Sequence, residues 1–178
     1  MTMAIGTERY SGFARLLHWT IVALVVAQFA VAWSMPDIHR GTEPVGLVAW
    51  HLSIGTAILA IMVVRAVWRL VHREPPPPSS LSPLLRMVSR TTHVILYALL
   101  VALPLLGWAN ASSRGWPITL FGVIPLPPLM ATGARLGHTL GDVHGTVAIV
   151  LLVVIGLHVL GAAYHLLVVR DRTVQRML

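Results

Sequence analysis

The chain has 178 residues, of which 56% are hydrophobic and only 11% are charged, and its mean hydropathy is +0.79. Soluble domains are about 45–50% apolar and about 25% charged, so this composition excludes an ordinary soluble domain. Cysteine is absent, which excludes disulfides, iron–sulfur clusters and covalently attached c-type haem. The formal charge of +7 comes from basic residues at the ends of apolar runs, a distribution that favours membrane topology over nucleic-acid binding.

Four apolar stretches are long enough to cross a hydrocarbon core of about 30 Å. In chain order they are Leu16–Met35, Gly46–Val71, Val88–Ala109 and Leu140–Val169. Prolines separate them, at Pro36, at Pro44, in the run Pro75–Pro78 and in the stretch Pro117–Pro128. Pro104 inside the third stretch predicts a kink. The pattern predicts an all-α membrane protein, a four-transmembrane-helix bundle that forms one domain over residues 1–178.

The arginines predict the orientation of this bundle. Ten flank one side of the spans: Arg9, Arg15, Arg65, Arg69, Arg73, Arg86, Arg90, Arg170, Arg172 and Arg176. The other side has Arg40, Arg114 and Arg135. The positive-inside rule therefore places both termini in the cytoplasm. The first stretch also has the basic flank of a signal peptide, but its length and its His18 favour a retained span.

Nine histidines in so apolar a chain are the main chemical clue. Ionisable side chains are costly in lipid and usually face the bundle interior or a functional pathway. Four lie well inside the spans: His18, His51, His144 and His158. Two lie in spans near cytoplasmic ends, His93 and His165, and three lie in or beside loops, His39, His72 and His138.

The spacing of His144 and His158 indicates two haems. They are 14 residues apart (158 − 144), so they share a helix face at depths roughly 21 Å apart. Each would supply one axial ligand, and each iron needs a second imidazole at the same depth. His51 matches the depth of His144 on the outer side. His18 is the natural inner partner of His158, with His93 as the alternative.

Glycines gather beside these histidines, where small residues allow a flat porphyrin to approach a helix. They are Gly141 and Gly145 near His144, Gly156 and Gly161 near His158, and Gly55 one turn beyond His51. Small residues also let membrane helices pack closely, which is the competing interpretation. Zinc or copper would need three or four ligands at one place. The separated histidine pairs favour haem over such a metal site.

Six segments resemble the bacterial cytochrome b561 family, in order and with similar spacing along essentially the whole chain. They are RLLHW (Arg15–Trp19), WHLSIG (Trp50–Gly55), VVRAVWRL (Val63–Leu70), HVILYALLVALPLLGW (His93–Trp108), VHGTVA (Val143–Ala148) and IGLHVLGAAYH (Ile155–His165). The resemblance implies a cytochrome of the bacterial inner membrane with two b-type haems. By motif position, it implies that His18 and His158 ligate the cytoplasmic-side haem, and His51 and His144 the periplasmic-side haem.

The resemblance also implies an activity, the oxidation of superoxide at the periplasmic haem and the reduction of ubiquinone near the cytoplasmic side. His165 then corresponds to a histidine close to the quinone pocket. Arg15 and Arg65 correspond to arginines near the haem edge, where they would balance propionates, or else they only anchor the helices. The outer-loop Arg114 and Arg135 would attract an anionic substrate, or are simply solvated charges.

Two other functions remain open from the sequence. The chain could be a cytochrome b electron-transfer subunit that serves a partner dehydrogenase. It could also be a haem-free membrane channel or scaffold in which histidines form interhelical hydrogen bonds. The short loops favour a self-contained oxidoreductase.

Overall fold

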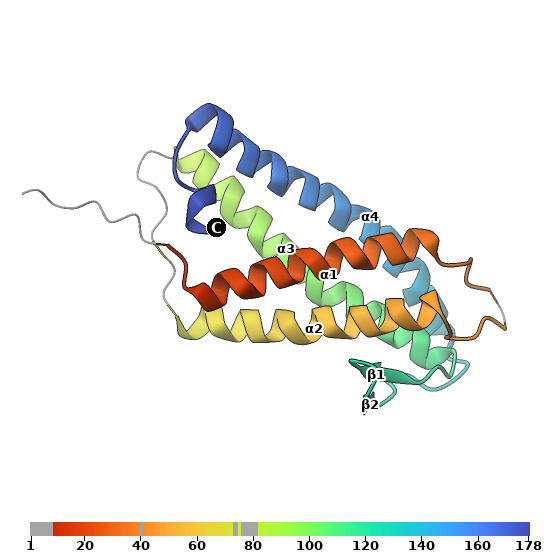
Figure 1. Cartoon of the computed structure of the whole chain (residues 1–178). Coiled ribbons are helices and arrows are strands. Elements are labelled where there is room, and N and C mark those ends of the chain that lie inside the picture. The colour runs from red at the N-terminus through yellow and green to blue at the C-terminus, as the bar shows by residue number, and fades with distance from the viewer. Residues whose placement is uncertain (1–8, 40, 73–74, 76–81) are drawn as a thin grey trace, which may run out of the picture.

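Four long helices dominate the computed structural model, which describes residues 9–39, 41–72, 75 and 82–178 (Figure 1). They are α1 (Gly12–Ser34), α2 (Leu47–Val71), α3 (Pro83–Ser113) and α4 (Arg135–Tyr164). Each is long and apolar enough to cross a membrane. The predicted four-helix membrane fold is therefore confirmed. Arg40, Arg73 and all of the Pro75–Pro78 run except Pro75 lie outside the described residues.

Two helices, α1 and α3, begin before their apolar stretches, each after a serine whose side chain caps it. α1 begins after Ser11, whose hydroxyl accepts the Ala14 N–H at 3.2 Å. α3 begins five residues before the predicted Val88, with Ser82 as its cap and Pro83 in the first turn. It continues as one helix through Pro104 to Ser113.

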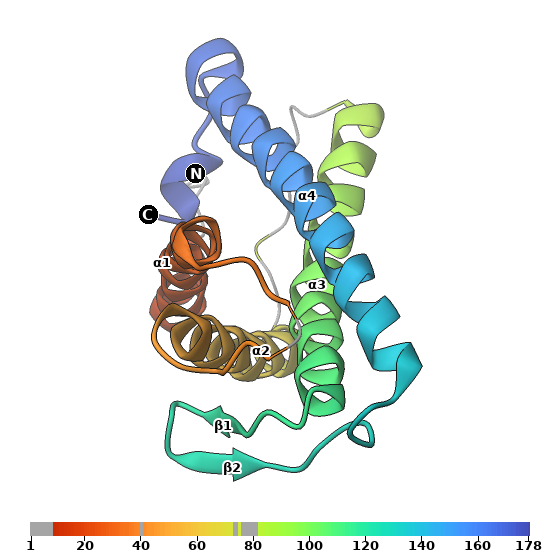
Figure 2. The same ribbon diagram turned by 90° about the vertical axis from the view of Figure 1, so that its right-hand side faces the viewer.

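A short β-hairpin follows α3 where the sequence predicts only a proline-rich linker. β1 (Ile118–Leu120) pairs antiparallel with β2 (Ile124–Leu126), and the turn has positive φ at Phe121 and Gly122. The Thr56 hydroxyl in α2 donates to the Thr119 carbonyl at 2.9 Å. The hairpin is thereby fixed across the ends of α2 and α3 (Figure 2).

Three of the helices share a buried core, and the fourth packs mainly against one of them. α1, α2 and α3 pack around Ile21, Ile58 and Met62, which are all buried. α4 packs along α3 and crosses away from α1 and α2 (Figure 2). Only 6% of its apolar window is buried, against 28% for α2. The space between α4 and the α1–α2 pair is therefore bridged mainly by side chains, among them the histidines described below.

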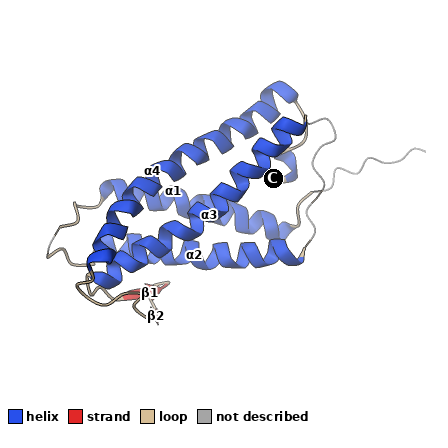
Figure 3. Cartoon of the chain, turned by 180° about the vertical axis from the view of Figure 1, so that it is seen from behind, coloured by secondary structure: helices blue, strands red, loops and turns tan. Residues whose placement is uncertain are grey.

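The chain reverses after α4 through a π-helical turn, η1 (His165–Val169), and Arg170, which has φ 54°. A 3₁₀ turn, η2 (Val174–Arg176), then passes under the start of α1, where the Tyr10 N–H donates to the Arg176 carbonyl at 3.1 Å. The described ends of the chain thus meet at one end of the bundle, and the hairpin lies at the other (Figure 3). These are called the inner and outer ends.

Candidate functional site

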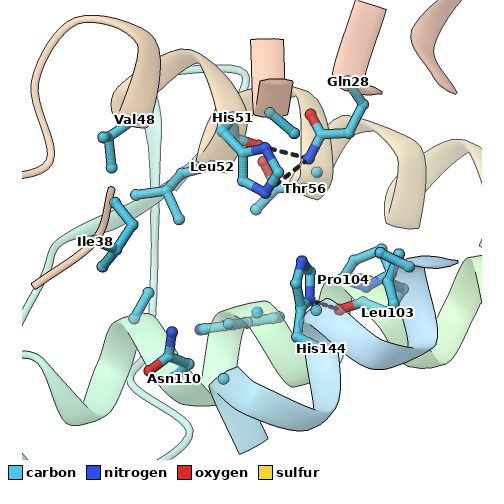
Figure 4. A pocket seen from close by; sticks show the side chains of 18 of the residues that line it. Gln28, Ile38, Val48, His51, Leu52, Thr56, Leu103, Pro104, Asn110 and His144 are labelled. Atoms are coloured by element: carbon cyan, nitrogen blue, oxygen red, sulfur yellow. Dashed lines mark hydrogen bonds between the residues drawn. The ribbon is translucent and has the colours of Figure 1, made fainter. Parts of the chain in front are cut away.

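His51 of α2 and His144 of α4 face each other near the outer end. Their ring centroids are 6.0 Å apart and their planes are inclined at 72°. The two rings line a cavity of about 400 Å³ that opens between α1, α2, α3 and α4. Figure 4 shows the His144 ring pointing across this cavity toward His51. The structure therefore brings together the two residues that were predicted as outer partners.

The environment of His144 fixes its ring against α3. Its Nδ1 donates to the Leu103 carbonyl at 2.9 Å, which leaves Nε2 available for a ligand (Figure 4). A Cβ on Gly107 would lie 3.1 Å from Cε1 of this ring, so glycine makes room for it. Neither Gly107 nor Leu103 has a chemical signal of its own in the sequence, so neither is a predicted site residue.

Gln28 of α1 holds His51 from the other side. Its side-chain amide lies 3.2 Å from His51 Nε2 and donates to the His51 carbonyl at 3.1 Å (Figure 4). His51 Nδ1 and Gln28 Oε1 are both buried without a hydrogen-bond partner. Gln28 was also missed, although an amide inside an apolar run is a signal that could have indicated it.

Three histidines meet near the inner end. His158 of α4 lies with its ring centroid 6.4 Å from that of His18 in α1 and 5.1 Å from that of His93 in α3. The Nδ1 of His93 donates to the Ser89 carbonyl at 2.7 Å, a bond within its own helix. Both inner candidates from the sequence thus face His158, at different distances.

These distances can be compared with what an iron between two imidazoles needs. Two metal–nitrogen bonds of about 2.0–2.1 Å, with roughly 1.1–1.2 Å from each nitrogen to its ring centre, place the centroids about 6.2–6.6 Å apart. The pair His18–His158 falls in this interval, and His51–His144 is shorter by a small fraction of an ångström. The 5.1 Å between His93 and His158 is more than an ångström too short. The outer pair and the cavity that its rings line fit bis-imidazole haem ligation, and the inner pair His18–His158 fits it by its ring separation.

A different kind of metal centre finds no support in the described part of the chain. No group of three or more histidine, aspartate or glutamate side chains there is arranged to hold a metal ion.

The glycines that flank the histidines divide into two kinds. A Cβ on Gly141 would lie 2.8 Å from the Asn110 amide, so this glycine serves helix packing, whereas Gly145 and Gly156 face open space.

The two arginines predicted near a haem edge take part in helix contacts. Arg65 donates from Nε to the Tyr97 hydroxyl and from a terminal nitrogen to the Ala14 carbonyl, both at 2.9 Å. It also lies within electrostatic range of His18 and His158. Arg15 donates to the Leu178 carbonyl, and its Nε is buried without a partner. Arg65 therefore joins three helices beside the inner histidines.

His165 lies at the inner end, hydrogen-bonded to a carboxylate. Its Nδ1 is 2.8 Å from Oδ2 of Asp171, a residue that the sequence analysis did not single out. At the outer end, Arg114 lines the cavity, donates to the Asn110 side chain at 3.3 Å and stacks over Trp116. Arg135 is exposed at the start of α4.

A four-helix membrane bundle with facing imidazole pairs at two depths has the architecture of a membrane b-type cytochrome. The chain belongs to the prokaryotic cytochrome b561 family, whose model matches residues 9–178. It is thus a membrane electron-transfer protein of the oxidoreductase type, and the family implies b-type haem. The family resemblance and the electron-transfer role predicted from the sequence are confirmed.

Three relatives cover nearly the whole chain. Cytochrome b561 homolog 2 of Escherichia coli is 29% identical over 100% of this chain and 95% of its own length. Probable superoxide oxidase CybB of Yersinia pestis is 33% identical, with 96% of each protein covered. Cytochrome b561 homolog 1 of Escherichia coli is 25% identical over 96% of this chain and 97% of its own length.

Proposed function

We propose that this cytochrome holds two b-type haems and transfers electrons from superoxide at its outer side to ubiquinone near its inner side. In this proposal His51 and His144 would hold the outer haem, and His18 and His158 would hold the inner haem. The observation that carries this proposal is that two histidines at two levels of α4 each face a second imidazole. The ring centroids are 6.0 Å apart at His144 and 6.4 Å apart at His158. When bound, each haem supplies a one-electron iron couple tuned by its burial.

The chain's own residues hold and orient the ligands. The Leu103 carbonyl accepts the hydrogen bond from Nδ1–H of His144 and so fixes the tautomer and orientation of this ring, as backbone carbonyls commonly do for metal-binding histidines. Arg65 places a positive charge beside the inner pair, where it can balance a propionate. With two imidazoles holding each haem, the iron would be closed to outside ligands, and substrates would exchange electrons at the edge of each site.

The donor is inferred from the relative named as a superoxide oxidase and from the charge of the outer end. Arg114 lines the outer cavity, and its guanidinium offers a positive field to an anion. Arg135 adds a second exposed charge at the same end. In the net reaction, two superoxide anions become two dioxygen molecules, and one ubiquinone takes up two electrons and two protons to become ubiquinol.

The acceptor site is proposed at the inner end, beside His165, Arg15 and the inner histidine pair.

The same proposal places the protein in the bacterial inner membrane as one domain over residues 1–178, with both termini in the cytoplasm. The arginine distribution and the meeting of the described chain ends at one end of the bundle support this orientation.

The test begins with the detergent-solubilised protein. A reduced-minus-oxidised spectrum with a sharp low-spin α-band, and two haems per chain by pyridine haemochrome, are expected. Superoxide generated enzymatically should then reduce a soluble ubiquinone analogue in stoichiometric amounts, with superoxide dismutase abolishing the reaction. A colourless protein would contradict the cofactor assignment. A haem-replete protein that reduces quinone only with a co-purified dehydrogenase would contradict superoxide as the electron donor.

A further inference from the structure

His165 and Asp171 form a partly buried imidazole–carboxylate pair at the inner end. The two side chains are only 14% and 15% exposed, and Nδ1 of His165 lies 2.8 Å from Oδ2 of Asp171. The second carboxylate oxygen, Oδ1, accepts the backbone N–H of Thr173 at 2.8 Å. The Asp171 N–H in turn donates to the His165 carbonyl at 3.3 Å. The carboxylate is therefore fixed by the chain reversal itself.

This geometry determines which nitrogen of His165 is available. An ionised carboxylate only accepts hydrogen bonds, so Nδ1 must carry the proton that it shares with Asp171. The other nitrogen, Nε2, has no hydrogen bond among the described residues. A carboxylate that orients a histidine in this way fixes its tautomer and stabilises the protonated ring.

The pair lies close to the proposed inner haem ligands. His165 follows His158 by seven residues (165 − 158), nearly two helical turns, which places it on a similar face roughly 10 Å further along the axis. The tail beyond Asp171 turns back to α1, where the Met177 carbonyl accepts the Trp19 indole N–H at 3.0 Å. Trp19 itself lies edge-on to His18, with centroids 5.4 Å apart. The tail thus connects the pair to the inner histidine site.

Hydrogen bonds within the pair and its loop keep Asp171 ionised. Burial alone would raise the pKa of its carboxyl, but hydrogen bonds from Thr173 and His165 outweigh it and lower the pKa below its usual value. The Tyr164 ring lies 6.3 Å from that of His165. The neighbouring charged groups of the tail are Arg170 and Arg172, and Arg9 and Arg176 line a pocket with Arg172. Asp171 is thus a carboxylate at neutral pH.

We propose that His165 is the proton donor to the inner electron acceptor and that Asp171 is its positioning residue. This inference rests on the proposed function, in which the acceptor is a quinone. Each quinone that accepts two electrons also needs two protons on its oxygens. His165 gives one proton from Nε2 and is reprotonated from the cytoplasmic water, while Asp171 holds Nδ1–H and stabilises the imidazolium. An acceptor that takes electrons without protons does not need the pair.

The experiment compares two acceptors with the haem-loaded, chemically reduced protein. Reoxidation is followed in a stopped-flow instrument with a soluble ubiquinone analogue and, separately, with ferricyanide, which takes one electron and no proton. The variants are Asp171→Asn, Asp171→Glu and His165→Gln, and Asp37→Asn is the control, an exposed carboxylate at the outer end. Haem content and optical spectrum are recorded for each.

We expect Asp171→Asn to slow the quinone reaction at least tenfold at neutral pH and to change its pH–rate profile. The ferricyanide reaction should be unchanged, Asp171→Glu should restore part of the quinone rate, and Asp37→Asn should behave as the unaltered protein. His165→Gln should show the same quinone-specific loss. Because its amide can still donate to Asp171, this variant tests the inference even where Asp171→Asn disturbs the tail.

Quinone rates that are equal in the unaltered protein, Asp171→Asn and His165→Gln at every pH would overturn the inference and leave the proposed function standing. A loss of the same size with ferricyanide would overturn it too, because the defect would then lie in electron transfer or folding. If the unaltered protein is oxidised by ferricyanide but not by quinone, the proposed acceptor itself is wrong.

Discussion

His51 on α2 and His144 on α4 face each other with ring centroids 6.0 Å apart, although they are 93 residues apart in the chain (144 − 51). Each ring is held by its own contact, His51 by the Gln28 amide and His144 by the Leu103 carbonyl. The contacts come from α1 and α3, so all four helices contribute to the position of this one pair. Ligand variants of the pair are the most direct test of the two-haem proposal.

Replacing either outer histidine should remove one haem and leave the other. For His51→Ala and His144→Ala, we expect haem per chain to fall from two to one by pyridine haemochrome, with the inner haem still low-spin. His138→Ala is the matched control, since His138 lines the same cavity but is exposed and faces no second imidazole at a ligating distance. Retention of two haems in both outer variants would contradict the assignment.

The inner pairing is tested by comparing His18 with His93. His18→Ala should lose the inner haem, because its 6.4 Å separation from His158 suits two metal–nitrogen bonds. His93→Ala should keep two haems, because 5.1 Å is too short for such bonds. Electron paramagnetic resonance of the oxidised protein would report which low-spin signal disappears. The opposite result would make His93 the ligand.

Arg65 should raise the midpoint potential of the inner haem. Its positive charge near His18 and His158 disfavours the oxidised iron, and such a charge contributes on the order of 1–2 kcal/mol at this range, or roughly 50–90 mV for one electron. Redox titration of Arg65→Gln should therefore show a decrease of about that size in one of two transitions. Arg69→Gln, one turn further toward the inner end, should shift the potential much less. An unchanged potential would restrict Arg65 to its contacts with Tyr97 and Ala14.

Close packing of α3 against α4 depends on glycine at position 137. A Cβ there would lie 2.2 Å from the Ser113 Cβ and 3.2 Å from the Ala109 carbonyl oxygen, neither of which can easily move. Gly137→Ala should therefore destabilise the protein by about 1–3 kcal/mol, the usual cost of overpacking. Thermal unfolding in detergent measures this. Gly12→Ala, where a Cβ meets nothing within 4 Å, should leave the melting temperature nearly unchanged.

The fold was largely readable from the sequence because lipid imposes a simple rule. A helix must satisfy its own backbone hydrogen bonds in the membrane, so an apolar run of sufficient length is almost always a spanning helix. The same rule does not apply to the segment 117–128, where two short strands form. Their pairing depends on Thr56 in α2 and on backbone conformations at Phe121 and Gly122 that no hydropathy pattern reports.

The candidate ligands and their outer pairing were also readable, but the side chains that hold them were not. Histidines in an apolar run are rare enough to stand out, and helical geometry alone gives the spacing of His144 and His158. The choice between His18 and His93 depended on the tilt and rotation of α1 and α3, which residue depth does not determine. Asp171 was missed because its importance comes from what it touches, whereas Gln28 has the signal of an amide inside an apolar run.

By itself, the sequence determined the membrane environment, four spans, the absence of any cysteine-based cofactor and the histidines available for haem. These follow from composition and from the geometry of single helices, which local physics governs. Only the tertiary structure decided which rings face each other, which glycines serve helix packing, and that the chain after Val169 folds back so that Asp171 meets His165. Such contacts depend on how helices cross and on side-chain packing between segments far apart in the chain, to which no local pattern is sensitive.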